Sequence, residues 1–161
     1  MKNIFLSRPN KFDPIYQNSV DKLTEELDHR GLYPITIGST VFPNGIPVKE
    51  IKKQMHECKG IIILGIPQIL IKDGIYKPGS ENETRINNKL YPSVWNQIEG
   101  AMAFIIGIPI MIIADNELKC DGLFENGTLP LSTHRYNLKN SDWINDKSFI
   151  DPFNEWIGEL E

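Results

Sequence analysis

Apolar and polar residues alternate along this chain in blocks that predict strands and helices in turn. Continuous apolar runs rich in Ile and Leu are typical of buried strands; they lie at 3–6, 33–38, 60–65 and 109–113. Apolar residues spaced three and four apart predict helices; these cover 16–27, 48–58, 93–107 and the segment that begins at 151. A further edge strand is predicted at 133–138.

Residues with known preferences at helix ends set the expected limits of these helices. Gly31 stands where a C-terminal cap is expected after the first helix, and Pro47 lies in the first turn of the second. Asp151 followed by Pro152 predicts the start of the last helix, as a cap residue with proline at the first helical position.

Strands that alternate with helices predict a mainly parallel sheet with helices on both faces. We therefore expect an α/β fold, a single three-layer flavodoxin-like sandwich with four to five strands, and no internal boundary divides residues 1–161. The polar segment 67–90 interrupts the alternation and is rich in Asn, Asp, Glu and Gly. It predicts a long loop with room for a small hairpin, of the kind that forms a lid or a specificity element.

Composition excludes several classes of function. The net charge is -4, and no cluster of Lys and Arg has the density expected of a nucleic-acid site. Two cysteines and three scattered histidines form no disulfide framework and no zinc pattern. The longest apolar run is broken by Gly107 and Pro109 and falls short of a membrane span, and the N-terminus lacks the pattern of a signal peptide. We expect a soluble cytoplasmic protein without a metal site.

In an open parallel sheet, ligands bind outside the carboxyl ends of the strands. The residues that follow the first three predicted strands are therefore candidates for substrate binding; they are Ser7, Arg8, Pro9, Gly38, Gly65, Pro67 and Gln68. Arg8 suits a phosphate or carboxylate, and the glycines allow a backbone to approach a ligand. These turns contain neither of the two common nucleotide-binding glycine motifs, and each also fits an ordinary turn.

One acidic residue, Glu99, lies within the helix predicted at 93–107. It shares a stripe with Ala103 and Ile106, and no Lys or Arg lies between Lys89 and Lys119 to pair with it locally. Two alternatives remain open on this pattern. Glu99 is either partly exposed near the helix N-terminus, where the helix dipole favours it, or it is held inside, where burial raises the pKa of its carboxyl.

The pattern Ser93-x-Trp95-x-x-x-Glu99 resembles the segment that carries the catalytic glutamate in Toll/interleukin-1 receptor (TIR) domains. The loop 43–47, with the helix and strand after it, is similar to the corresponding part of that family. The segment EGAMAFIIGIPIMII, which begins at Glu99, equally resembles nucleoside 2-deoxyribosyltransferases, a related fold. The resemblance covers roughly residues 3–114.

Both families cleave an N-glycosidic bond at C1′ of a ribose with a glutamate, so the resemblance implies that Glu99 is catalytic and that Trp95 and Asn96 contact the substrate. Three functions stay open. The first is an NAD-consuming TIR-like enzyme, a hydrolase or cyclase of bacterial antiphage defence, for which NAD is a substrate and no cofactor is needed. The second is a nucleoside or nucleotide N-glycosidase or deoxyribosyltransferase-like enzyme, and the third is a non-catalytic binding module. The resemblance further implies a homo-oligomer and a partner protein of a defence system, with no nucleic-acid or membrane partner.

Overall fold

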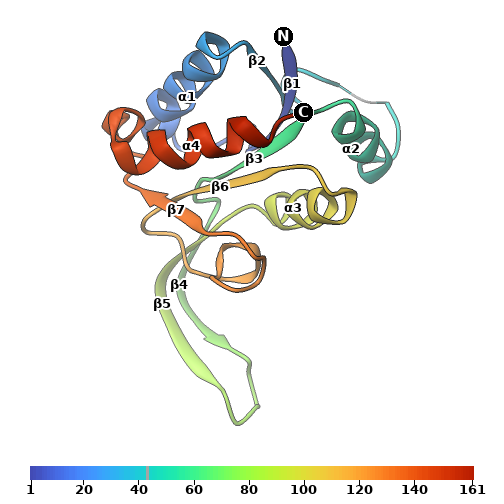
Figure 1. Cartoon of the computed structure of the whole chain (residues 1–161). Helices are drawn as coiled ribbons and strands as arrows, with labels where there is room; N and C mark the ends of the chain where they lie inside the picture. The colour runs from blue at the N-terminus through green and yellow to red at the C-terminus, as the bar shows by residue number, and fades with distance from the viewer. Residues whose placement is uncertain (43) are drawn as a thin grey trace.

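A five-stranded parallel sheet forms the centre of the computed structural model, which describes residues 1–42 and 44–161 (Figure 1). Pro43, in the loop that resembles the TIR loop, lies outside the described residues. The order across the sheet is β2-β1-β3-β6-β7. The strands are β1 (Lys2–Ser7), β2 (Leu32–Ile35), β3 (Gly60–Gly65), β6 (Ile110–Asp115) and β7 (Thr133–Tyr136), and every adjacent pair is parallel. This confirms the predicted flavodoxin-like α/β fold.

Helices cover both faces of this sheet (Figure 1). On one face, α1 (Gln17–His29) and α4 (Lys147–Glu159) pack against one set of alternating strand residues; on the other, α2 (Pro47–His56) and α3 (Val94–Ile106) pack against the other set. Among the described residues, short 3-10 turns lie at Pro14–Tyr16, Gly122–Phe124 and Asp142–Asn145. In the described residues, no helix has both the length and the apolar character required to cross a membrane.

The segment predicted as a long loop with room for a small hairpin is a regular antiparallel hairpin over most of its length. It consists of β4 (Ile69–Tyr76) and β5 (Thr84–Tyr91) and extends away from the central sheet (Figure 1). Most side chains on both faces of this hairpin are exposed, the polar residues of β5 and also the apolar Ile69, Leu70 and Ile75 of β4. The two Asp73 carboxylate oxygens accept from Arg85 across the strands at 3.0 Å. The polar residues that predicted a loop therefore belong to a hairpin that is exposed to solvent on both faces.

Smaller differences aside, such as the end of β7 at Tyr136 rather than at 138, the limits of β2 and α4 were wrong. Strand β2 ends at Ile35 rather than at 38, because the chain turns at Thr36, whose hydroxyl donates to the Leu6 carbonyl at 2.9 Å. Helix α4 begins at Lys147 rather than at Asp151, so Pro152 lies inside it. A proline there cannot donate to the carbonyl four residues earlier, that of Ser148. The hydroxyl of Tyr136 donates to that carbonyl instead, at 2.8 Å, which replaces the missing helical hydrogen bond.

We expect Tyr136→Phe to lower the free energy of unfolding by about 0.5–1.5 kcal/mol, the usual net contribution of one hydrogen bond. The ring keeps its stacking on Trp143, with centroids 5.1 Å apart, so the change isolates the hydroxyl. Urea unfolding of the two proteins measures the difference. Tyr33→Phe, at an exposed tyrosine of β2, is the matched control, and an equal loss there would contradict the role of Tyr136.

Candidate functional site

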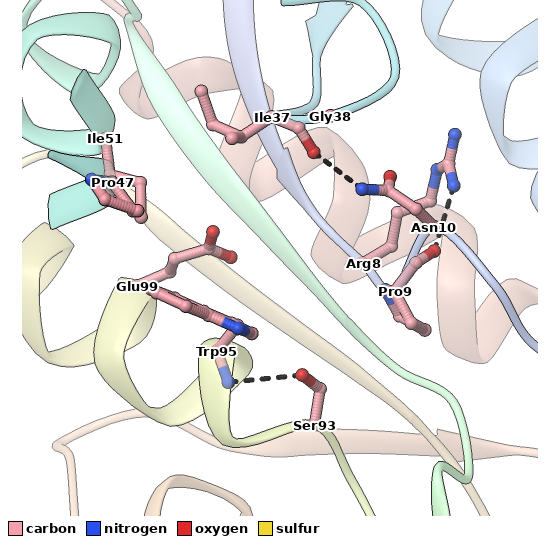
Figure 2. A pocket seen from close by; sticks show the side chains of 10 residues that line it. All are labelled: Arg8, Pro9, Asn10, Ile37, Gly38, Pro47, Ile51, Ser93, Trp95 and Glu99. Atoms are coloured by element: carbon pink, nitrogen blue, oxygen red, sulfur yellow. Dashed lines mark hydrogen bonds between the residues drawn. The ribbon is translucent and has the colours of Figure 1, made fainter. Parts of the chain in front are cut away.

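A cavity of about 270 Å³ lies beside the carboxyl ends of β1 and β2, between the first turns of α2 and α3 (Figure 2). The residues that line it come from four segments; they are Arg8, Pro9, Asn10, Ile37, Gly38, Pro47, Ile51, Ser93, Trp95 and Glu99. This is the edge of the sheet at which parallel α/β folds bind ligands. It is also next to the point where strand order reverses, between β1 and β3.

Helix α3 fixes the position of Glu99 through its start and its packing. The Ser93 hydroxyl caps the helix by accepting from the Trp95 amide at 3.1 Å, and Gly107 ends it with a φ of 81°. One residue after Glu99, a Cβ on Gly100 would lie 2.6 Å from Leu123. The helix backbone at Gly100 therefore packs directly against the segment after β6. This contact fixes the position of the Glu99 backbone at the cavity wall.

The Glu99 carboxyl is buried and has no cation beside it. Only 7% of the residue is exposed, and burial raises the pKa of its carboxyl to about 7. No ion pair among residues 1–42 and 44–161 includes it. Figure 2 shows the carboxyl directed into the space between α2 and the end of β1. Of the alternatives left open by the sequence, the structure therefore supports the buried carboxyl.

Ser7 and Asn96 form a buried polar contact behind Glu99. The Asn96 amide donates to the Ser7 hydroxyl at 2.9 Å and to the Ser7 carbonyl at 3.2 Å, which ties α3 to the end of β1. Because the Ser7 oxygen accepts from Asn96, its own proton is free to be donated to Glu99. That donation lowers the pKa of the Glu99 carboxyl and opposes the larger effect of burial.

We expect Ser7→Ala to move the pKa of Glu99 to higher pH, because the variant loses a donor to the ionised carboxylate while the residue stays buried. Carbon-13 NMR of labelled glutamate measures this pKa directly, without an activity assay. Ser39→Ala is the control, since Ser39 is an exposed serine that accepts from Arg8. An unchanged Glu99 titration in Ser7→Ala would show that the hydroxyl does not reach the carboxylate.

Arg8 lines the cavity, but its guanidinium is turned away from Glu99 (Figure 2). It donates to the Pro9 carbonyl at 3.0 Å and to the Ser39 hydroxyl at 3.1 Å. Its Nε is buried without a partner, and burial lowers the pKa of the guanidinium. Arg8 therefore supplies positive charge at the cavity edge, apart from the carboxylate, and keeps one donor unused.

Gly38 and Asn10 form the opposite wall. Gly38 has a φ of +76°, and a Cβ on it would overlap the Asn10 side-chain amide, which donates to the Ile37 carbonyl at 2.9 Å. Glycine is therefore required here for the close approach of Asn10. Sequence reasoning missed Asn10 although it follows the Ser-Arg-Pro turn directly, and that position was the available signal. It also missed the apolar wall formed by Ile37, Pro47 and Ile51.

Five predicted substrate-binding residues do not line this cavity. Ser7 and Asn96 form the buried contact behind Glu99, and the other three, Gly65, Pro67 and Gln68, lie elsewhere. At Gly65, a Cβ would lie 2.6 Å from the ring of Phe124, so the glycine makes room for a core side chain. Pro67 and Gln68 line a separate surface depression of about 580 Å³ near the base of the hairpin. The turn after β3 thus borders a different hollow from Arg8, Pro9 and Asn10, although later residues of the segment after β1, Phe12 to Tyr16, also reach that second hollow.

The remaining predicted residue of this group, Trp95, lies at the mouth of the cavity with 46% of its surface exposed (Figure 2). A half-exposed indole offers an apolar face on which a planar ring can stack. Within the described residues, no group of three or more His, Cys, Asp or Glu side chains is placed to hold a metal ion. The cavity thus combines one buried carboxyl, one cation at its edge and one aromatic face.

Comparison with known proteins identifies a relative in fold but not in sequence. No protein-family model and no curated protein matches the chain. Among solved structures, it is similar to the Clostridium botulinum CMP N-glycosidase BcmB, with a TM-score of 0.54 and 14% sequence identity. The match covers 96% of this chain and 99% of that one. At this identity the likeness shows a shared fold over nearly the full length of both chains, and the TIR resemblance is not confirmed.

Proposed function

We propose that this protein cleaves the N-glycosidic bond of a nucleoside or nucleotide, with Glu99 as the catalytic carboxylate. The observation that carries the proposal is the buried, unpaired carboxyl of Glu99 directed into a cavity at the ligand-binding edge of the sheet. Keeping such a group costs stability, so it is expected where chemistry needs it. The shared fold with a CMP N-glycosidase supports the same class of reaction.

The reaction needs a group that stabilises positive charge at C1′ of the sugar. As the bond from C1′ to the base nitrogen breaks, its electron pair leaves with the base, and C1′ becomes electron-deficient. The ionised Glu99 carboxylate either attacks C1′ or stabilises this cation electrostatically. Water then adds at C1′ and gives up a proton, and the base gains one. If Glu99 has attacked, the bond from its carboxylate to C1′ breaks in this step and the carboxylate is released. Among the described residues that line the cavity, Glu99 is the only carboxylate. It is therefore the candidate for this role whether the carboxylate attacks C1′ or stabilises the cation.

The size of the cavity favours a small substrate. At about 270 Å³ it lies just below the range of roughly 300–1,000 Å³ typical of ligand pockets. This suits a nucleoside or a mononucleotide, with the base against Trp95 and the sugar over Glu99. Arg8, with an unused buried donor at the cavity edge, is our candidate for the phosphate of a nucleotide.

NAD⁺ is the second candidate substrate. The observation that favours it is that Ser93, Trp95 and Glu99, the residues of the TIR-like pattern, all line the same cavity. Nicotinamide and its ribose would occupy the cavity, and the adenosine part would extend past Trp95. Action within antiphage defence, together with a partner protein, stays a prediction from the TIR resemblance.

A substrate panel separates these functions. The purified protein is incubated with nucleosides, nucleoside monophosphates and NAD⁺, and released bases are identified by mass spectrometry. We expect a free nucleobase from a nucleoside or a nucleoside monophosphate. Nicotinamide release without nucleobase release would favour the NAD-consuming enzyme. Binding of a nucleotide without any turnover would favour the non-catalytic module and contradict the proposal.

A further inference from the structure

A second hollow lies at the same edge of the sheet as the candidate active site and has a volume of about 580 Å³. The segments after β1, β3, β6 and β7 all border it, and among the residues they contribute are Asp13, Gln68, Glu117 and Lys139. Open parallel sheets bind ligands in the crevice between the turns where strand order reverses, here those after β1 and β3. The volume is within the range of roughly 300–1,000 Å³ of ligand pockets. The second hollow is therefore placed and sized as a binding site for a small molecule.

Apolar side chains form most of the wall of the second hollow. Ile69 and Leu70 come from the base of the hairpin β4–β5, and Phe12 and Ile15 come from the segment after β1. Three of them, Ile15, Ile69 and Leu70, are each about half exposed. A ligand with an apolar body would remove this surface from water, which is favourable.

Tyr16 is the buried polar side chain of the second hollow. Only 4% of the residue is exposed, and its ring belongs to the apolar core on the face of the sheet covered by α1. Its hydroxyl makes no hydrogen bond with any other of the described residues. A buried tyrosine usually finds a partner for its hydroxyl. An unused donor and acceptor on a buried side chain that lines the hollow indicates that a ligand supplies the partner.

Carboxylates outnumber cations around this hydroxyl. Asp13 and Glu117 line the second hollow, and Asp115 is buried at the end of β6. Burial raises the pKa of the Tyr16 hydroxyl most; Asp115, Glu117 and Asp13 raise it further, and Lys139 lowers it. Among the described residues that line the hollow, Lys139 is the only cation, and it already donates to the Glu117 carboxylate. The hollow therefore favours a ligand that brings a positive charge and N–H donors, and it disfavours a phosphate or a carboxylate.

We propose that the second hollow binds a small organic cation with an apolar body. The ammonium group of this ligand donates to the Tyr16 oxygen and to the Glu117 carboxylate, and its apolar body covers the half-exposed wall. Binding releases Lys139 from Glu117, which costs little because both side chains are partly exposed and exposed ion pairs contribute little to stability. The inference does not depend on the proposed reaction, because the second hollow contains neither Glu99 nor Trp95.

Three ligands that share a phenyl ring on a short alkyl chain test the charge of the head group. They are phenethylamine, phenethyl alcohol and phenylpropionate, which end in an ammonium, a hydroxyl and a carboxylate. NMR of the nitrogen-15-labelled wild type follows its amide resonances during each titration. We expect the amine to shift the amides of Tyr16, Gln68 and Leu70 and to bind about tenfold more tightly than the alcohol, because its hydrogen bonds are charge-assisted. The carboxylate should not bind there. Shifts confined to the surroundings of Trp95 and Glu99, equal affinities for amine and alcohol, or no shifts with the amine up to on the order of 10 mM would overturn the proposal.

Two substitutions test the residues assigned to the head group. Tyr16→Phe removes only the hydroxyl and should raise the dissociation constant of the amine about fivefold, the usual effect of one lost hydrogen bond. Glu117→Gln removes the carboxylate and should abolish most of the preference for the amine over the alcohol. Tyr33→Phe and Glu155→Gln change an exposed tyrosine and an exposed glutamate that do not line the hollow; they are the matched controls and should bind as the wild type. Wild-type binding of the amine by either Tyr16→Phe or Glu117→Gln would overturn the proposal.

Discussion

Replacing Glu99 by glutamine is expected to lower kcat/KM for cleavage of the N-glycosidic bond by on the order of 10³-fold, because the amide can neither attack C1′ nor neutralise the charge that develops there. Glutamine keeps the length and shape of the side chain in a site where only 7% of the glutamate is exposed. Substrate binding should change far less, since the variant loses a contact that matters most in the transition state. Steady-state kinetics and calorimetric titration of the same preparation measure both quantities.

Glu155→Gln provides the control for the kinetic prediction. Glu155 is an exposed carboxylate on α4, on the opposite face of the sheet from Glu99, and its loss should leave kcat/KM unchanged. If Glu99→Gln kept kcat/KM within a few-fold of the wild type, Glu99 would not be the catalytic group. If the variant lost binding and turnover to the same degree, Glu99 would be a binding residue.

The second large effect concerns stability, and here we expect Glu99→Gln to be more stable than the wild type. In the folded chain, burial raises the pKa of the Glu99 carboxyl from 4.5 to about 7. Below pH 4.5 the carboxyl is protonated in both the folded and the unfolded chain, so it carries no penalty. As the pH rises from there to 7, the unfolded chain releases the proton more readily, and the folded state loses up to about 3 kcal/mol.

The stability gain of Glu99→Gln should therefore depend on pH. It should be largest above pH 7, at roughly 2–3 kcal/mol, and should shrink toward pH 4.5, where the wild-type carboxyl is neutral in both states. Urea unfolding of the wild type and the variant at pH 5, 6, 7 and 8 gives the curve. The difference in unfolding free energy between Glu155→Gln and the wild type should be the same at every pH. A destabilised Glu99→Gln at pH 8 would mean that the ionised carboxylate has a strong partner besides the Ser7 hydroxyl, which would contradict a pKa raised by burial.

The core of the fold could be predicted because its residues obey simple periodicities. Strand β3 occupies the predicted residues 60–65, where every position is buried, and α1 and α3 follow their apolar spacing to the expected ends. The predictions failed where exposure to solvent, or a contact with a residue distant in sequence, determined the structure instead of the local apolar spacing. Both faces of the hairpin β4–β5 are largely exposed, so apolar and polar residues do not alternate regularly along its strands. The start of α4 depends on Tyr136, which lies far from Pro152 in sequence.

The site could be predicted in part for the same reasons. The sequence singled out Glu99 but left both a buried and a partly exposed carboxyl open. Arg8, Pro9 and Gly38 follow from the rule that ligands bind at the carboxyl ends of strands. The division between Pro9 and Pro67 could not be predicted, because it depends on which other segments surround each turn: α2 and α3 beside Pro9, and the base of the hairpin beside Pro67. The contact between Asn10 and Gly38 forms only when two turns meet in space. The sequence of one turn does not predict that the other lies beside it.

Incorporation of oxygen-18 from water tests directly whether the protein hydrolyses the N-glycosidic bond with Glu99. The protein is incubated with a set of nucleoside monophosphates in water enriched in oxygen-18, and the sugar and base products are resolved by mass spectrometry. The account predicts free base together with a sugar phosphate that carries one oxygen-18 atom at C1′, formed by the wild type and not by Glu99→Gln. Nucleotides that remain intact, or a labelled product that Glu99→Gln forms as fast as the wild type, would contradict it.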